Sequence, residues 1–185
     1  EFNIVAAEYV GGYVFAQDDT GALYGFKYED MLKDSFVLEH TFVAQLDNVY
    51  QDFAYSYAEG KLYGLLAYID RDGYPNTEIF SINIGEPYFD ETMYMEVGAY
   101  DEVSMVGRGG LMGLSMAIDD EGTIYVMGNF YDMTWDENDN PVYIPDETAS
   151  LWMVGLEYDQ WSDSWMLGWQ MTNLGNVPQT MDFLQ

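Results

Sequence analysis

Two short acidic segments contain the residue types that bind calcium. One has the sequence DRDGYPNTE and begins at Asp70, and the other is WDENDNP and begins at Trp135. Calcium takes about six to eight oxygen ligands, which clustered Asp, Glu and Asn side chains can supply. The candidate ligands are Asp70, Asp72, Asn76, Glu78, Asp136, Asn138 and Asn140. Two interpretations stay open: a structural calcium ion in at least one segment, or a solvated hairpin tip whose Asp, Asn and Gly residues serve the turn.

Aromatic and cationic residues form a second set of candidates, for binding an organic ligand. Trp161, Trp165 and Trp169 follow one another at intervals of four, which places them on one face of a strand or of a helix. Exposed tryptophan rings stack on sugars or prolines, whereas buried ones fill the space between neighbouring sheets. Arg108, between glycines, either binds a carboxylate or sulfate or neutralises nearby acids. These four residues are the predicted ligand contacts.

Adjacent carboxylates raise the question of catalysis. A glycosidase needs two carboxyl groups about 5 to 9 Å apart in a cleft. The adjacent acids are Asp18 with Asp19, Asp101 with Glu102, and Asp119 with Asp120. In a chain with 33 acidic residues such pairs arise readily by chance, so they are interpreted as turn and surface residues and no catalytic residue is assigned. Cysteine is absent and His40 is the single histidine, which excludes thiolate chemistry and multi-histidine zinc sites.

Composition restricts the partners of the chain. Its 185 residues fit one domain, and its net charge of −28 excludes phosphate-based binding of nucleic acid. The same charge argues against docking on anionic membranes, and no run of about 20 apolar residues predicts membrane insertion. Hydrophobic residues make up 49% and aromatic residues 17% of the chain, which is enough to build a core.

A hairpin-like pattern occurs three times. The segments are YVFAQDDTGALYGF (13–26), DFAYSYAEGKLYGLLAY (52–68) and LSMAIDDEGTIYVMGNF (114–130). Each has an apolar run, a few polar residues, then Gly-x-(Leu/Ile)-Tyr, which is typical of two strands around a glycine-bearing turn. Glycine suits this place because the turn requires a positive φ angle.

Further strands follow each hairpin. Residues 77–84 and 91–98 follow the second one, residues 150–158 and 164–172 follow the third, and residues 35–46 hold one long or two short strands after the first. Residues 132–147 are expected to be an added surface loop. The lead-in LDNVYQDF (46–53) recurs as LGNVPQTMDF (174–183), which suggests a further unit. The expected four-stranded units are residues 12–46, 52–98 and 114–172, with residues 174–185 starting a fourth.

Repeated four-stranded units predict an all-β fold, an incomplete β-propeller of about three antiparallel blades plus the start of a fourth, within a single domain over residues 1–185. Three blades do not close a ring. We therefore expect a piece of a longer array, or self-association through open blade edges.

The pattern D-x-x-G-x-L-Y-G at Asp18, followed elsewhere by EIFSINI (78–84) and EVG (96–98), resembles the repeat of bacterial extracellular β-propeller proteins. The resemblance is in particular to the repeats of large surface proteins of gut-type Gram-positive bacteria. The resemblance implies a cell-surface or secreted location and a binding or scaffold role, and it carries over no catalytic residue. The expected function is a non-catalytic module that recognises a glycan or a protein. The alternative is a carboxylate-based glycan hydrolase or lyase acting on a propeller face.

Overall fold

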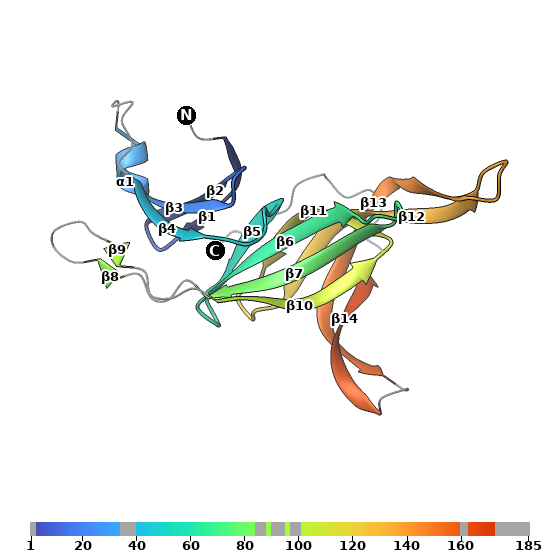
Figure 1. Ribbon diagram of the computed structural model, residues 1–185. Coiled ribbons are helices and arrows are strands. Elements are labelled where there is room, and N and C mark those ends of the chain that lie inside the picture. The colour runs from blue at the N-terminus through green and yellow to red at the C-terminus, as the bar shows by residue number, and fades with distance from the viewer. Residues whose placement is uncertain are drawn as a thin grey trace.

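The computed structural model describes residues 3–33, 40–83, 88–89, 95–96, 101–159 and 163–172. These residues form three four-stranded antiparallel sheets and a two-stranded one (Figure 1). The first sheet contains β1 (Ile4–Val10), β2 (Tyr13–Asp18), β3 (Ala22–Lys27) and β4 (His40–Gln45). The second contains β5 (Asp52–Ser56), β6 (Lys61–Ile69), β7 (Pro75–Asn83) and β10 (Asp101–Gly109). The third contains β11 (Leu111–Ile118), β12 (Ile124–Trp135), β13 (Pro141–Asp159) and β14 (Ser164–Thr172).

The all-β prediction is confirmed, since the described residues contain one short helix, α1 (Tyr28–Met31), beside these strands. None of the described helical residues forms a segment long and apolar enough to cross a membrane. Each large sheet is a meander in which consecutive strands pair, apart from the step from β7 to β10. The expected start of a fourth unit, residues 174–185, lies outside the described residues.

Two strand positions differ from the sequence-based expectation. The first sheet already begins at β1, ahead of residue 12, so the recurring hairpin is β2–β3 there but β5–β6 and β11–β12 in the other sheets. The fourth strand of the second sheet is β10, not residues 91–98, from which β9 (Met95–Glu96) pairs with β8 (Tyr88–Phe89). β10 pairs with β7 from Asp101 to Gly109. This pairing places Val106 against the second buried hydrophobic cluster, and that contact stabilises it.

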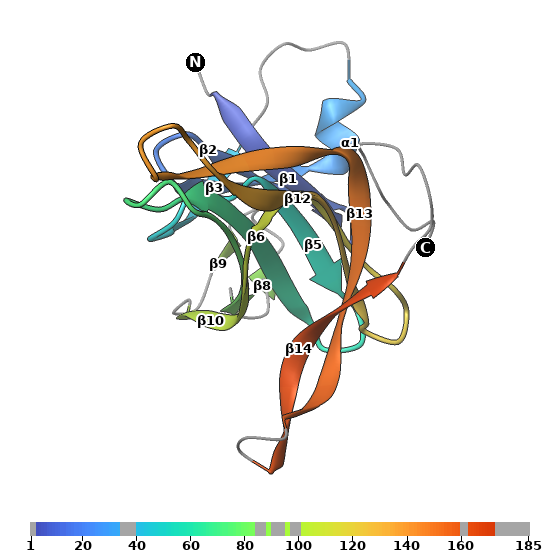
Figure 2. The same ribbon diagram turned by 90° about the vertical axis from the view of Figure 1, so that its right-hand side faces the viewer.

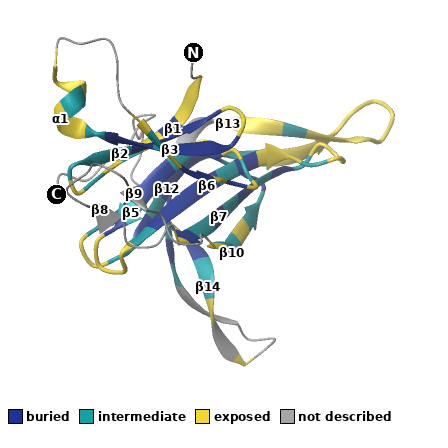
Figure 3. Ribbon diagram, turned by 60° about the vertical axis from the view of Figure 1, so that its left-hand side comes forward, coloured by how far each residue is buried: buried dark blue, intermediate teal, exposed yellow. Residues whose placement is uncertain are grey.

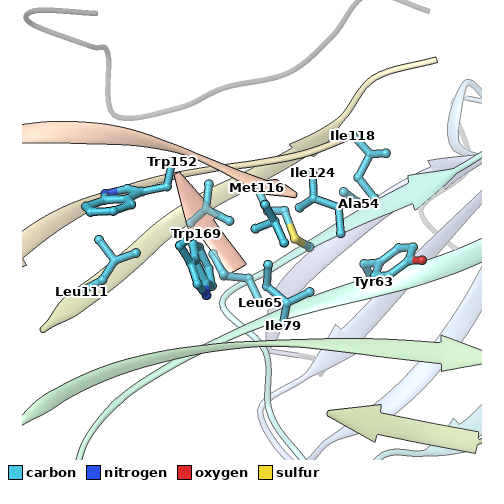
Figure 4. Close-up of a cluster of buried hydrophobic side chains, with 12 residues drawn as sticks. Ala54, Tyr63, Leu65, Ile79, Leu111, Met116, Ile118, Ile124, Trp152 and Trp169 are labelled. Atoms are coloured by element: carbon cyan, nitrogen blue, oxygen red, sulfur yellow. The ribbon is translucent and has the colours of Figure 1, made fainter. Parts of the chain in front are cut away.

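The second sheet is the middle layer of the molecule. Neighbouring residues along its strands alternate between two hydrophobic cores: Phe53 and Leu62 face the first sheet, whereas Ala54 and Tyr63 face the third. Figure 3 shows the buried strands at the centre, and Figure 4 shows the second core. Both faces of β5 and of most of β6 are therefore largely covered, whereas β10 at the edge of the sheet is mostly exposed.

The first strands of successive sheets are linked by side chains. Glu8 on β1 accepts a hydrogen bond from the Tyr55 N–H on β5 (3.1 Å), and Asp52 on β5 accepts one from the Met116 N–H on β11 (2.7 Å). In each case a carboxylate binds a backbone donor of the next sheet. The same type of link therefore joins the three sheets in series.

The segment before β5 fits tightly between the first two sheets. Buried Gln17 donates to the Asn48 carbonyl (2.7 Å) and accepts from the Tyr50 N–H (2.9 Å). The Glu102 carboxylate on β10 accepts hydrogen bonds from the Asn48 side chain and from the Tyr50 hydroxyl. The lead-in motif thus ties β2, β5 and β10 together.

Four hairpin turns share one construction. An aspartate starts the turn, and its Oδ1 accepts hydrogen bonds from the backbone N–H groups two and four residues later, at 2.7 to 3.1 Å. The residue three positions after the aspartate has a positive φ angle, which favours glycine. The aspartates are Asp18, Asp70, Asp119 and Asp136, and the positive-φ residues are Gly21, Gly73, Gly122 and Asp139.

The tyrosine of the recurring Gly-x-(Leu/Ile)-Tyr pattern reaches back to a carboxylate of its own turn. The pairs are Tyr24 with Asp18, Tyr63 with Glu59, and Tyr125 with Asp119. Burial, and then the neighbouring carboxylate, raises the pKa of all three phenols. Burial and Glu102 raise the pKa of Tyr50 in the same way.

Alkaline pH is expected to destabilise the protein because of these tyrosines. Above about pH 10 the unfolded chain loses phenol protons that the folded chain retains, so the free energy of unfolding falls as pH rises. Below that pH the tyrosines are protonated in both states, and their full contribution to the free energy of unfolding is present. Urea unfolding, followed by circular dichroism, measures the free energy of unfolding between pH 8 and pH 11. This free energy should fall less steeply with pH for Tyr63→Phe than for the wild type. Tyr57→Phe, at an exposed turn residue, is the control. A Tyr63→Phe loss as steep as that of the wild type would contradict this explanation.

Candidate binding surface on the β12–β13 arm

β12 and β13 extend beyond the other strands of the third sheet. Residues 131–135 and 141–145, here called the arm, pair with each other, whereas β11 pairs with β12 only as far as Phe130 and β14 pairs with β13 from Leu151 onward. Within the described part of the chain, no third strand joins the arm. Figure 1 shows it projecting from the sheet, and Figure 2 shows β13 continuing from it into the third sheet.

One face of the arm is apolar and open to solvent. The register pairs Tyr131 with Pro145, Met133 with Tyr143, and Trp135 with Pro141, which places all six on one face. Met133 is 54% exposed and Trp135 is 60% exposed. An isolated two-stranded hairpin is only marginally stable in water, and exposed apolar patches of this kind mark contact surfaces.

The tip of the arm is held by the aspartate turn. Asp136 accepts hydrogen bonds from the Asn138 and Asn140 N–H groups (2.7 and 2.9 Å), and Asn140 also donates from its side chain. The Asn140 backbone hydrogen bond, followed by the other donors, lowers the pKa of Asp136. Asp139 takes the positive φ angle of 60°. The acidic segment is thus a closed hairpin turn with its charges facing water.

Backbone hydrogen bonds and aromatic rings anchor the base of the arm. Tyr131 N–H donates to the Gly110 carbonyl (2.7 Å), and Gly110 N–H donates to the Pro75 carbonyl (2.8 Å). The Tyr143 ring lies edge-on to Tyr74, with centroids 5.0 Å apart. Gly110 has φ of 79°, and a Cβ there would lie 3.2 Å from the Phe130 ring. The β6–β7 turn and the β10–β11 corner therefore fix the direction of the arm.

Arg108 lies beside this base. Its guanidinium carbon is 5.0 Å from the centroid of the Trp152 ring, which forms a cation–π contact, and Phe130 stacks on the same ring at 6.1 Å. The buried Arg108 Nε and Trp152 Nε1 have no hydrogen-bond acceptor among the described residues. Trp152 thus contacts both Arg108 and Phe130 at the base of the arm.

The side chains of two of the four predicted ligand contacts, Arg108 and Trp169, lie within the described structure. Trp169 lies in the second core and is 6% exposed, so its ring packs between sheets instead of forming an open platform (Figure 4). Trp161 lies outside the described residues, as does the side chain of Trp165. Arg108 contacts Trp152, a residue that sequence reasoning did not single out as a site.

The predicted calcium ligands separate into distinct hydrogen-bond sets. Asp70 holds the backbone N–H groups of Asp72 and Tyr74, and the Asn76 side chain donates to it at 3.3 Å. Glu78 instead accepts from the Tyr68 hydroxyl at 2.6 Å. Asp136, Asn138 and Asn140 lie at the arm tip. The described residues contain no group of three or more His, Asp or Glu side chains arranged to hold a metal ion. Calcium binding stays a prediction.

The adjacent carboxylates have structural partners. Hydrogen bonds led by the Thr20 hydroxyl lower the pKa of Asp18, whereas a general acid needs a raised one. Asp119 accepts a hydrogen bond from the Thr123 N–H of its own turn, and Glu102 accepts one from the Asn48 side chain of the lead-in segment. This arrangement favours the interpretation of these acids as turn and packing residues.

Sequence reasoning missed the arm. Residues 132–147 were expected to form a loop, but they mostly continue β12 and β13. The signal was the alternation of Tyr131, Met133 and Trp135, with a second apolar run after the acidic turn. No protein-family model matches the chain, and no curated protein matches its sequence significantly.

Proposed function

We propose that the chain is a non-catalytic binding and scaffold module whose arm binds a protein partner. The observation that carries the proposal is the exposed apolar face of the arm, on which Met133 occupies the middle row and Trp135 the row next to the tip. The carboxylates of the hairpin turns and sheet links bind backbone donors, which supports a role in packing over a role in chemistry.

The arm indicates the chemistry of this partner. Its face offers aromatic, methionine and proline side chains, and its tip carries Asp136, Glu137 and Asp139. A matching partner presents an apolar groove flanked by lysine or arginine. The net charge of −28 attracts such a cationic surface from a distance and makes the association rate dependent on salt.

The module fits within a β-propeller-like array of a bacterial surface or secreted protein. Three antiparallel meanders follow one another, with their first strands linked by Glu8 and Asp52. Such serial packing around neighbouring first strands is compatible with blades arranged about an axis. The repeated hairpin motif supports the same assignment.

A random peptide library displayed on phage tests the proposed binding surface. Peptides selected on the wild-type chain should be rich in apolar and basic residues, and Trp135→Ala should weaken their binding about tenfold or more, because Trp135 is the largest exposed ring of the arm face. Ile69→Ala, at an apolar side chain of similar exposure outside the arm, is the matched control. Equal binding to the wild type and Trp135→Ala, or selection of peptides without basic residues, would refute the proposal.

A further inference from the structure

The two edges of the arm differ in their backbone chemistry. In an antiparallel pair, rows whose residues exchange hydrogen bonds alternate with rows whose backbone N–H and C=O groups point away from the pair. At the tip, the Asp136 N–H donates to the Asn140 carbonyl (2.9 Å), which makes this row a hydrogen-bonded one. The next row, Trp135 with Pro141, is therefore of the outward-pointing kind, as is every second row after it. These outward-pointing rows are the three that form the apolar face of the arm.

Two further observations agree with this assignment. Pro141 and Pro145 have no N–H, so neither can complete a hydrogen-bonded row. The Tyr131 N–H, in the row that pairs Tyr131 with Pro145, donates to the Gly110 carbonyl at 2.7 Å, which lies outside the pair. The backbone groups of these rows therefore point outward, to the β12 edge on one side and to the β13 edge on the other.

Prolines block one edge of the arm and leave the other open. On the β13 edge, Pro141 and Pro145 offer no donor, which leaves the Tyr143 N–H between them. Proline on an edge strand hinders the addition of another strand. On the β12 edge, Met133 and Trp135 each present an N–H and a C=O, and no strand among the described residues pairs with them on that side. The strand is exposed along this stretch, so its edge can accept a partner.

Other edge strands of the three large sheets are interrupted. The pairings of β1, β4, β10 and β11 each contain a register shift that leaves one residue of the edge strand without a partner. Bulges of this kind twist an edge away from a regular ladder and hinder strand addition. The register of β12 has no shift between Tyr131 and Trp135. The β12 edge of the arm thus has neither a proline nor a bulge.

We propose that an extended segment of the partner protein adds to the β12 edge of the arm as a third strand. This inference rests on the proposed function, to which it adds the conformation and the sequence pattern of the partner. Outward N–H and C=O groups on alternate residues match the backbone of a β-strand, which can bind all of them. The added strand forms one side of the apolar groove that takes the face of the arm. A third strand also stabilises a hairpin that is marginal by itself.

The side chains of β12 predict the sequence of the added strand, because neighbours on one face of a sheet contact each other. On the apolar face the added strand lies beside Tyr131, Met133 and Trp135, which favours apolar residues. On the opposite face it lies beside Asp132 and Thr134, which favours lysine or arginine. An alternating apolar and basic segment therefore fits this edge. A second copy of β12 does not, since it brings another acidic strand and a second net charge of −28.

A synthetic peptide of about nine residues that alternates valine and lysine is the first probe. The wild type should bind it at least about tenfold more tightly than a peptide of the same composition with its valines and lysines in separate blocks, as isothermal titration calorimetry measures. Because the two peptides have equal charge, the difference excludes general attraction to an acidic protein. Equal affinity for the two peptides, or no binding of either, would overturn the proposal.

Proline and alanine at Met133 separate its backbone N–H from its side chain. Both substitutions remove the side chain, but only Met133→Pro removes the outward N–H. Met133→Pro should bind the alternating peptide about fivefold or more weakly than Met133→Ala, because one peptide carbonyl loses its donor. Tyr143→Pro and Tyr143→Ala make the matched change directly across the arm, on the β13 edge, and should bind alike. Circular dichroism melts check that the four variants are folded.

N-methylated peptides test the same hydrogen bonds without altering the protein. A peptide residue opposite Met133 or Trp135 exchanges hydrogen bonds with it and shares its apolar face, so the valine N–H groups face β12 and the lysine N–H groups face away. Methylation of the valine nitrogens should weaken binding about tenfold or more, whereas methylation of the lysine nitrogens should leave it unchanged. Equal effects of the two methylations would overturn strand addition. Phage-selected peptides that need Trp135 but bind Met133→Pro and Met133→Ala alike would overturn strand addition alone and leave the proposed function standing.

Discussion

Gly128→Ala is expected to destabilise the protein by about 3 kcal/mol, since overpacking a close backbone contact forces strands apart. Gly128 on β12 pairs with Gly113 on β11. A Cβ at Gly128 would lie 2.5 Å from the Met112 carbonyl oxygen and 3.0 Å from the Gly113 Cα, and backbone atoms of a paired strand cannot rotate away. Urea unfolding followed by circular dichroism measures the change.

Gly155→Ala is the matched control for this substitution. Gly155 lies on β13 of the same sheet, and a Cβ there would meet no atom within 4 Å. Alanine at such a position restricts the unfolded chain and adds no clash, so stability should stay the same or rise slightly. Equal losses for the two variants would show that the close approach at Gly128 is not the cause.

Trp152→Ala is expected to cost about 3 to 5 kcal/mol, because it leaves a cavity in the second core. Trp152 is 5% exposed, stacks on Phe130 and lies under Arg108. Trp152→Phe should cost much less, since it keeps an aromatic ring and removes an indole N–H that finds no acceptor among the described residues. Differential scanning calorimetry and urea unfolding of both variants measure the difference.

Trp135→Ala is the control that shows whether the stability loss in Trp152→Ala comes from the burial of the side chain or from the loss of any tryptophan. Trp135 is 60% exposed on the arm, so its replacement should change stability by no more than about 0.5 kcal/mol. If Trp152→Ala were as mild as Trp135→Ala, Trp152 would not be a central residue of the core. If Trp152→Phe were as severe as Trp152→Ala, the indole N–H would have a partner.

The hairpins were predictable because their chemistry is local. Gly21, Gly60 and Gly122 all have positive φ angles, as the turn pattern requires. Asp18 and Asp119 bind N–H groups only two and four residues away, so the sequence motif is the complete turn. Such features follow from neighbouring residues without knowledge of the rest of the fold.

The remaining features depend on contacts between distant residues. β10 pairs with β7 because its residues make long-range contacts: Glu102 binds Asn48, and Val106 packs against the second core. The burial of Trp169 depends on how the third sheet packs against the second. Neither result can be predicted from the local sequence. The same holds for the two-stranded arm, beside which the described residues place no third strand.

The middle sheet also determines how the molecule comes apart. β6 contributes Leu62 to one core and Tyr63 and Leu65 to the other, so detaching either outer sheet exposes side chains of β6 to water. Neither outer sheet can open without loosening the remaining pair, which makes the three sheets one cooperative unit. The amides of β6 therefore exchange with solvent only when the whole assembly opens, while those of the arm exchange through local fraying.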